Sequence, residues 1–295
     1  TGRNARPRID LRRPQRLPDG PGGLRAKAQR PLDERALAVV NGSIGEAVGK
    51  LYVDQKFPPE AKEKAEDMVG NVITAFKNRI ENLEWMQDST KTKAIEKLNK
   101  FTVKIGYPDD FEDYSDLEVT PEKTFYENMQ AVSMWNYKDN LSKIGEPVDK
   151  TEWGMSPQTV NAYFNPLFNE IVFPAAILQP PFYDYKADAA VNYGGIGAVI
   201  GHEISHAFDD SGARFDANGN LKNWWTDEDL EKFTERGNDL AELYSSIEVL
   251  DSVYINGKFT LGENIGDLGG VNAAYDGLQI HLEEHGNPGE IDGYT

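Results

Sequence analysis

Two histidines one helical turn apart, with a glutamate between them, are the residues of this chain whose spacing most directly implies chemistry. Residues 202–206 read His-Glu-Ile-Ser-His. On a helix, side chains four apart lie on the same face, so the imidazole nitrogens of His202 and His206 can converge on one zinc ion about 2 Å away. Glu203 then lies beside the metal without being needed as a ligand and can accept a proton from a water molecule. The pattern predicts a zinc site with hydrolytic chemistry.

The rarity of histidine makes this pattern specific. The chain has only four histidines, at 202, 206, 281 and 285, and a chance match should occur at well under about one per cent. The preceding residues 189–200 are apolar and small, which is typical of a buried helix, and Ser211-Gly212 is typical of a helix end. The alternative is a pair of histidines that are spaced by four without a metal.

A catalytic zinc ion needs a third protein ligand and an open position for water. The chain has no cysteine. Downstream, Glu263 and Asp267 are again four apart and so share a helix face. Glu263 could be the third ligand, and Asp267 could accept a hydrogen bond from a ligand histidine and fix its tautomer. The alternative is that Thr260-x-x-Glu263 is a capping box at a helix start.

These motifs resemble the neprilysin family of zinc metalloendopeptidases, which includes the endothelin-converting enzymes and bacterial oligopeptidases. The resemblance covers roughly residues 31–295 and is specific as a set. It rests on GHEISHAFDD (201–210), GENIGDLGG (262–270), VNAYF (160–164), IVFPAAILQPPF (171–182) and NWWT (223–226). The resemblance implies one zinc ion per chain, held by His202, His206 and Glu263, with Glu203 as general base. It also implies that Asp267 orients a ligand histidine and that Asn161 and Ala162 hold the main chain of a peptide substrate.

The resemblance further implies a mainly α-helical α+β fold, a thermolysin-like zinc peptidase catalytic domain with a small β-sheet beside the His-Glu-x-x-His helix. We predict a basic arm over 1–30, a helical region over 31–150 that is part of or leads into the family's helical domain, and a catalytic core over 151–295. Within this plan, proline and threonine signals predict helices at about 58–86, from Ser89 to 99 and from Thr120 to about 144. The alternating residues 101–105 predict a strand.

Residues 158–164 and 169–173 are expected to be two short strands joined by a turn at Asn165-Pro166. An exposed edge strand there could pair with a peptide by main-chain hydrogen bonds. The side-chain amide of Asn161 could bind a backbone group, and the small Ala162 would let the peptide approach. The alternative is an ordinary hairpin without a binding role.

Charge and composition limit the partners. The formal net charge of −18 argues against a nucleic-acid partner. Residues 1–35 nevertheless carry ten Arg or Lys against four Asp or Glu, and such an arm could bind nucleic acid or an anionic membrane. No run of 18 or more apolar residues predicts a membrane span. A periplasmic or secreted location is favoured over the cytoplasm.

Two further patterns resemble metal sites but are predicted to be ordinary structural features. The sequence His281-x-x-Glu284-His285 fits an inverted zinc pattern, but its place before Gly286-Asn287-Pro288 favours a solvated helix end. Residues 216–220 resemble a calcium loop, yet Leu221 stands where that loop requires glycine, which favours a turn.

The expected function is zinc-dependent hydrolysis of oligopeptides. The family continues past residue 295 with a segment that carries a histidine and an arginine, so the chain is expected to be a fragment that lacks this segment. The alternative is a zinc-binding, catalytically weak or silent fragment that acts with a partner chain, for example the remainder of the same enzyme.

Overall fold

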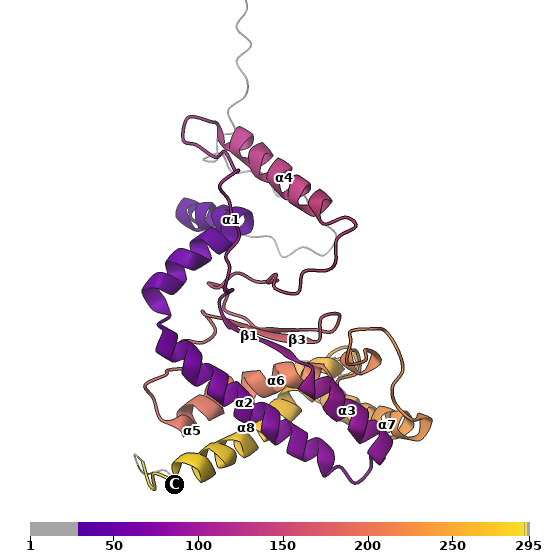
Figure 1. Ribbon diagram of the computed structural model, residues 1–295. Helices are drawn as coiled ribbons and strands as arrows, with labels where there is room; N and C mark the ends of the chain where they lie inside the picture. The colour runs from indigo at the N-terminus through magenta and orange to yellow at the C-terminus, as the bar shows by residue number, and fades with distance from the viewer. Residues whose placement is uncertain (1–28, 292, 294–295) are drawn as a thin grey trace, which may run out of the picture. The chain divides into compact units, whose positions relative to one another are not determined.

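The computed structural model describes residues 29–291 and 293 and confirms a mainly helical α+β fold with two small sheets (Figure 1). Nearly all of the predicted basic arm lies outside the described residues. None of the described helices is long and apolar enough to cross a membrane. The helices are α1 (Leu32–Lys56), α2 (Pro59–Glu81), α3 (Asp88–Asn99), α4 (Phe125–Ser142), α5 (Ala189–Asn192), α6 (Ala198–His206), α7 (Asp227–Ser245) and α8 (Leu261–His285). The strands are β1 (Thr102–Gly106), β2 (Tyr163–Asn165), β3 (Glu170–Pro174), β4 (Glu248–Leu250) and β5 (Val253–Tyr254).

The chain divides into two compact units that are interleaved in sequence. Of the described residues, the larger unit contains 52–108, 153–291 and 293, and the smaller unit contains 29–51 and 109–152. Residues 52–108 thus belong to the same unit as the segment after residue 152, which carries the His-Glu-x-x-His motif.

A three-stranded sheet in the larger unit explains this grouping. β3 is its central strand, with β1 parallel on one side and β2 antiparallel on the other. Ile171, Val172 and Phe173 of β3 are fully buried, as expected for a strand covered on both faces. Because β1 comes from the first sequence segment and β3 from the second, the two segments share one sheet and one hydrophobic core.

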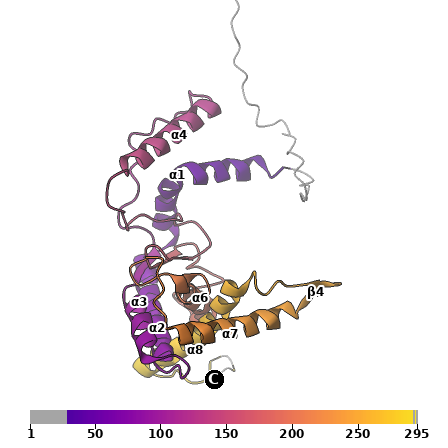
Figure 2. The ribbon, with the colours of Figure 1, turned by 90° about the vertical axis from the view of Figure 1, so that its right-hand side faces the viewer.

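Three helices, α2, α6 and α8, pack against one another and contribute to this core. α2 begins with Pro59 in its first turn, where a missing N–H costs nothing, and its apolar face includes Met68, Val69 and Val72. α6 packs mainly against α8, and both contact α2. α7 leads out to the β4–β5 hairpin (Figure 2), whose side chains are exposed.

Several predicted element boundaries were wrong for identifiable reasons. α3 starts after Gln87 rather than at Ser89. α4 starts at Phe125 rather than Thr120, because Thr124 and Glu127 form a reciprocal capping box. The stretch that we expected to be a continuous buried helix includes a five-residue π-helix, Tyr193–Gly197, between α5 and α6.

Candidate metal centre

Helix α6 brings the two motif histidines together. The ring centroids of His202 and His206 are 4.5 Å apart, with the ring planes nearly perpendicular at 88°. Both side chains are partly exposed, at 17% and 19%. Their Nε2 atoms both face Glu263 of α8. The spacing of four residues therefore produces the convergence that the sequence predicted.

Glu263 completes a compact set of donor atoms. Its Oε2 atom lies 3.3 Å from Nε2 of His202 and 4.0 Å from Nε2 of His206. Donor atoms of the three residues lie within 4.8 Å of one another, the one such group among the described residues. Two ligands bound tetrahedrally to zinc lie about 3.4 Å apart, so the arrangement fits the ion. Glu263 is 70% exposed, which leaves the site open to water and substrate.

The capping-box alternative for Glu263 is wrong. Thr260 is the N-cap of α8, but its side chain makes no capping hydrogen bond. Its hydroxyl instead donates to the carbonyl of Asn256 and accepts from the amide of Asn264. The Glu263 side chain is thereby left available to the two histidines.

Glycines set the distance between α6 and α8. A Cβ atom added to Gly201 would lie 2.7 Å from the Cα of Gly270, and one added to Gly266 would lie 2.7 Å from Cε1 of His202. A Cβ on Gly269 would overlap the hydroxyl of Ser205. Side chains at these positions would hold the helices apart. The glycines therefore allow Glu263 to reach the histidines.

A carboxylate contacts the second nitrogen of each histidine. Oδ1 of Asp267 lies 2.8 Å from Nδ1 of His202, as the sequence suggested. Oδ2 of Asp209 lies 2.8 Å from Nδ1 of His206, a contact that we did not predict. Its sequence signal was a carboxylate three residues after His206, just beyond the end of α6. Both contacts leave Nε2 free to bind a metal.

Asp209 is held firmly. It is 5% exposed, and its Oδ1 accepts hydrogen bonds from the backbone N–H groups of Ser211 (2.8 Å) and Gly212 (2.6 Å). Burial alone would lower the pKa of His206. The hydrogen bond to Asp209 and the charges of nearby carboxylates outweigh this effect, so the pKa of His206 lies above its usual value.

Glu203 occupies the environment of a proton acceptor. It is 7% exposed. Burial raises the pKa of its carboxyl group, whereas the two histidines and a hydrogen bond from the backbone N–H of Phe164 act in the opposite direction. Because Phe164 belongs to β2, this hydrogen bond links the glutamate to the edge of the sheet.

Asn161 and Ala162 immediately precede β2. The Asn161 side chain is exposed, while Ala162 is 6% exposed and belongs to the hydrophobic core. β2 pairs with β3 on one side only and is thus an edge of its sheet. A contribution of Ala162 to peptide binding would have to come from its main chain, since its methyl group faces the core.

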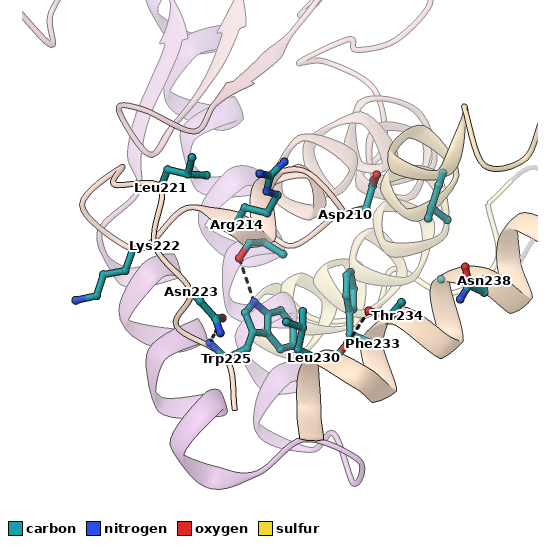
Figure 3. A pocket seen from close by; sticks show the side chains of 13 residues that line it. Asp210, Arg214, Leu221, Lys222, Asn223, Trp225, Leu230, Phe233, Thr234 and Asn238 are labelled. Atoms are coloured by element: carbon teal, nitrogen blue, oxygen red, sulfur yellow. Dashed lines mark hydrogen bonds between the residues drawn. The ribbon is translucent and has the colours of Figure 1, made fainter. Parts of the chain in front are cut away.

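A cavity of about 370 Å³ in the larger unit is lined partly by Asp210 and Arg214, which follow α6 (Figure 3). Trp225, Leu230 and Phe233 supply apolar lining, and Asp210 and Arg214 supply charge. The indole of Trp225 donates a hydrogen bond to the carbonyl of Ala213. Since both Trp225 and Ala213 line the cavity, this hydrogen bond fixes part of its wall to the segment that follows α6.

The other sequence candidates remain structural features. His281 and His285 stack at the end of α8, with centroids 4.3 Å apart, and they gather no third ligand among the described residues. Asp216 accepts hydrogen bonds from the backbone of Asn218 and Asn220, and this geometry confirms the predicted turn.

Comparison with known proteins identifies the family. Residues 20–108 and 161–294 match Peptidase family M13, and the chain belongs to this family. It is 45% identical over 246 residues to Neprilysin-3 of Drosophila melanogaster, covering 81% of this chain and 31% of that protein. It is 47% identical over 242 residues to a putative zinc metalloproteinase of Streptococcus gordonii, covering 82% of this chain and 43% of the other.

Solved structures agree with this assignment. The zinc metalloprotease Zmp1 of Mycobacterium tuberculosis, in complex with an inhibitor, has a TM-score of 0.83 and 47% identity, and the match covers 91% of this chain and 41% of that one. PepO from Lactobacillus rhamnosis has a TM-score of 0.80 and 34% identity, covering 84% and 39%. The chain thus spans less than half the length of these relatives.

Proposed function

We propose that this chain forms the metal-binding core of a zinc-dependent endopeptidase that hydrolyses oligopeptides. The observation that carries the proposal is the convergence of His202, His206 and Glu263, with Glu203 buried beside them. Zinc in such a site polarises a peptide carbonyl and lowers the pKa of a water molecule. A single ion fits the single donor group among the described residues.

Glu203 would act as the general base and then as the general acid. It would accept a proton from the attacking water and pass it to the nitrogen of the leaving amine. Its burial, which raises the pKa of the carboxyl group, suits a group that must both gain and lose a proton. Asp267 and Asp209 would hold the two imidazole rings in the tautomer that presents Nε2 to the metal.

The peptide would lie along the free edge of β2. Main-chain hydrogen bonds to an edge strand bind extended peptides without regard to their side chains. Asn161 would add a side-chain amide at the start of this edge. The hydrogen bond from Phe164 to Glu203 places the edge and the proposed base next to each other.

Two substitutions test the assignment. Glu203→Gln should retain one zinc ion per chain and lose cleavage of a quenched fluorescent peptide, because only the proton acceptor is removed. Glu263→Ala should lose zinc, because a ligand is removed. Full zinc-dependent cleavage by the first variant, or unchanged zinc content in the second, would overturn the assigned roles. Both measurements are made on this chain.

The second candidate function is a zinc-binding fragment with little activity of its own. The comparisons do not favour it over the endopeptidase, since the relatives are named as peptidases and the chain spans 31% of Neprilysin-3 and 41% of Zmp1. Zinc binding without cleavage by the chain, together with cleavage by the full-length protein or by the chain mixed with the remainder, would support it. A periplasmic or secreted location remains a proposal, with the cytoplasm as the alternative, and fractionation of cells that express the full-length protein tests it.

A further inference from the structure

A lysine buried outside the donor group contacts the segment that follows α6. Lys97, in the last turn of α3, is 1% exposed. Its Nζ atom donates hydrogen bonds to the carbonyl oxygens of Ala207 (2.7 Å), Gly212 (2.8 Å) and Phe215 (2.8 Å). An ammonium group has three N–H donors, so this set of carbonyls uses all of them. Burying an ammonium group is costly unless it is fully hydrogen-bonded.

All three acceptors lie in one loop, residues 207–215, which also contains Asp209. Within this loop, the N–H of Gly212 donates to Oδ1 of Asp209 (2.6 Å), and Oδ2 of Asp209 contacts Nδ1 of His206. Lys97 therefore hydrogen-bonds to the loop at two points near His206. One is Ala207, the residue immediately after His206, and the other is Gly212, whose N–H donates to Asp209. The ammonium is thus two hydrogen bonds removed from Asp209.

The loop is also held from the side of the cavity. The indole N–H of Trp225 donates to Ala213 (3.0 Å, Figure 3), and that of Trp224 donates to Phe215 (3.0 Å). These contacts reach the far half of the loop, at residues 213–215. Lys97, by contrast, also reaches the half that carries the histidine contact. Its loss should therefore loosen Asp209 while the two indoles still hold the end of the loop.

The charge of Lys97 suits this position. Burial lowers the pKa of Lys97 to about 8, and the carboxylates of Asp209 and Asp216 oppose the shift. Near neutral pH most Lys97 side chains are therefore protonated, and the ammonium group has the three N–H donors that the three carbonyls accept. The ammonium also lies near the faces of three aromatic rings, at 5.7 Å from Phe164 and Phe208 and 6.0 Å from Trp224, where a cation is favoured.

We infer that Lys97 is a positioning residue for the metal centre, acting through the 207–215 loop and Asp209 on the orientation of His206. The inference rests on the proposed zinc site. It adds that a residue from α3, far from the ligands in sequence, sets how well that site binds metal. Lys97 touches neither ligand nor substrate, and its effect should appear in metal affinity and ligand geometry.

The test compares Lys97→Met with Lys104→Met. Lys104 is a second buried lysine, paired with Glu170 at 2.7 Å in the sheet, so its loss controls for the general effect of removing a buried cation. Zinc affinity is measured by competition with a chelating dye, and ligand geometry by the visible spectrum of the cobalt-substituted protein. Lys97→Met should weaken zinc binding about 10-fold, within the range for residues that orient metal ligands, and should shift the cobalt spectrum. Lys104→Met should leave the spectrum unchanged.

A double-mutant cycle with Asp209→Asn tests the route of the effect. If Lys97 acts through Asp209, Lys97→Met should weaken zinc binding less than about 3-fold in the Asp209→Asn background, because the contact is already lost. Additive effects, or unchanged affinity and spectrum in Lys97→Met, would overturn the inference. If Lys97→Met does not fold, Lys97→Gln, which keeps an N–H donor without the charge, is measured in its place with the same expectations. Failure of the unaltered protein to bind zinc would instead refute the proposed function.

Discussion

Replacing Gly266 by alanine should separate zinc binding from stability. The new Cβ atom would lie 2.7 Å from Cε1 and 2.8 Å from Nδ1 of His202, whereas ordinary contacts begin at 3.4 Å. Retreat of α8 would open the close contact that Gly201 and Gly270 allow between the two helix backbones, and so would lose packing. We therefore expect the imidazole ring of His202 to move by several tenths of an ångström, away from its contact with Asp267.

The expected magnitudes differ for the two properties. Alanine favours a helix over glycine by about 1 kcal/mol, and overpacking costs about 1–3 kcal/mol, so the free energy of unfolding should fall by no more than about 2 kcal/mol. Misorienting a ligand histidine should weaken zinc binding about 10- to 100-fold. Most of the damage should therefore appear in metal affinity.

The assay is zinc titration against a chelating dye, together with urea denaturation of the metal-free protein. Gly70→Ala is the matched control, because a Cβ at this exposed position in α2 meets nothing within 4 Å. It should leave zinc affinity unchanged and raise stability by up to about 1 kcal/mol. A stable Gly266→Ala protein that binds zinc as tightly as the unaltered protein would refute the packing argument.

Two further outcomes are expected. Asp267→Asn should weaken zinc binding about 10- to 100-fold, while Asp239→Asn, at an exposed position on α7, should not change it; equal affinities in a dye competition would remove Asp267 from its orienting role. Folding lowers the pKa of Lys97 from 10.5 to about 8. Between these pH values the unfolded chain therefore binds more protons than the folded chain. The free-energy cost of burying the charge falls as the pH rises. The free energy of unfolding should then gain up to about 3 kcal/mol from pH 8 to 10.5 through this group, a gain that Lys97→Met should lack in urea denaturation at the two pH values.

Short-range spacing made much of the centre predictable. His202 and His206, four apart, and Glu263 and Asp267, four apart, each share a helix face, so one sequence rule located both halves of the donor group. Asp209 follows the end of α6, so the helix-face rule did not locate it. Likewise, Thr124 and Glu127 carried the capping-box pattern, although Pro121 drew the predicted helix start to Thr120.

Such local spacing rules do not predict contacts between segments that are far apart in the sequence. The parallel pairing of β1 with β3 joins residues 102–106 to 170–174, and no local pattern in either strand specifies its partner. The close approach of α6 and α8 depends on which glycines face each other, which a single helix does not reveal. The buried Lys97 looked like one more charge on a polar helix, because its acceptors are backbone carbonyls far along the chain.

The division of the larger unit into two sequence segments bears on how the molecule responds to cutting. Residues 109–152 leave this unit and the chain returns to it at residue 153, while β1 and β3 hold the two segments together by main-chain hydrogen bonds. A protease that nicks the intervening stretch would sever the covalent link without removing any strand, core residue or metal ligand of the unit. The nicked halves should remain associated and keep their zinc, and separately produced halves should reconstitute the site when they fold together. Because the two halves are then separate chains, the rate of reassembly should depend on their concentration.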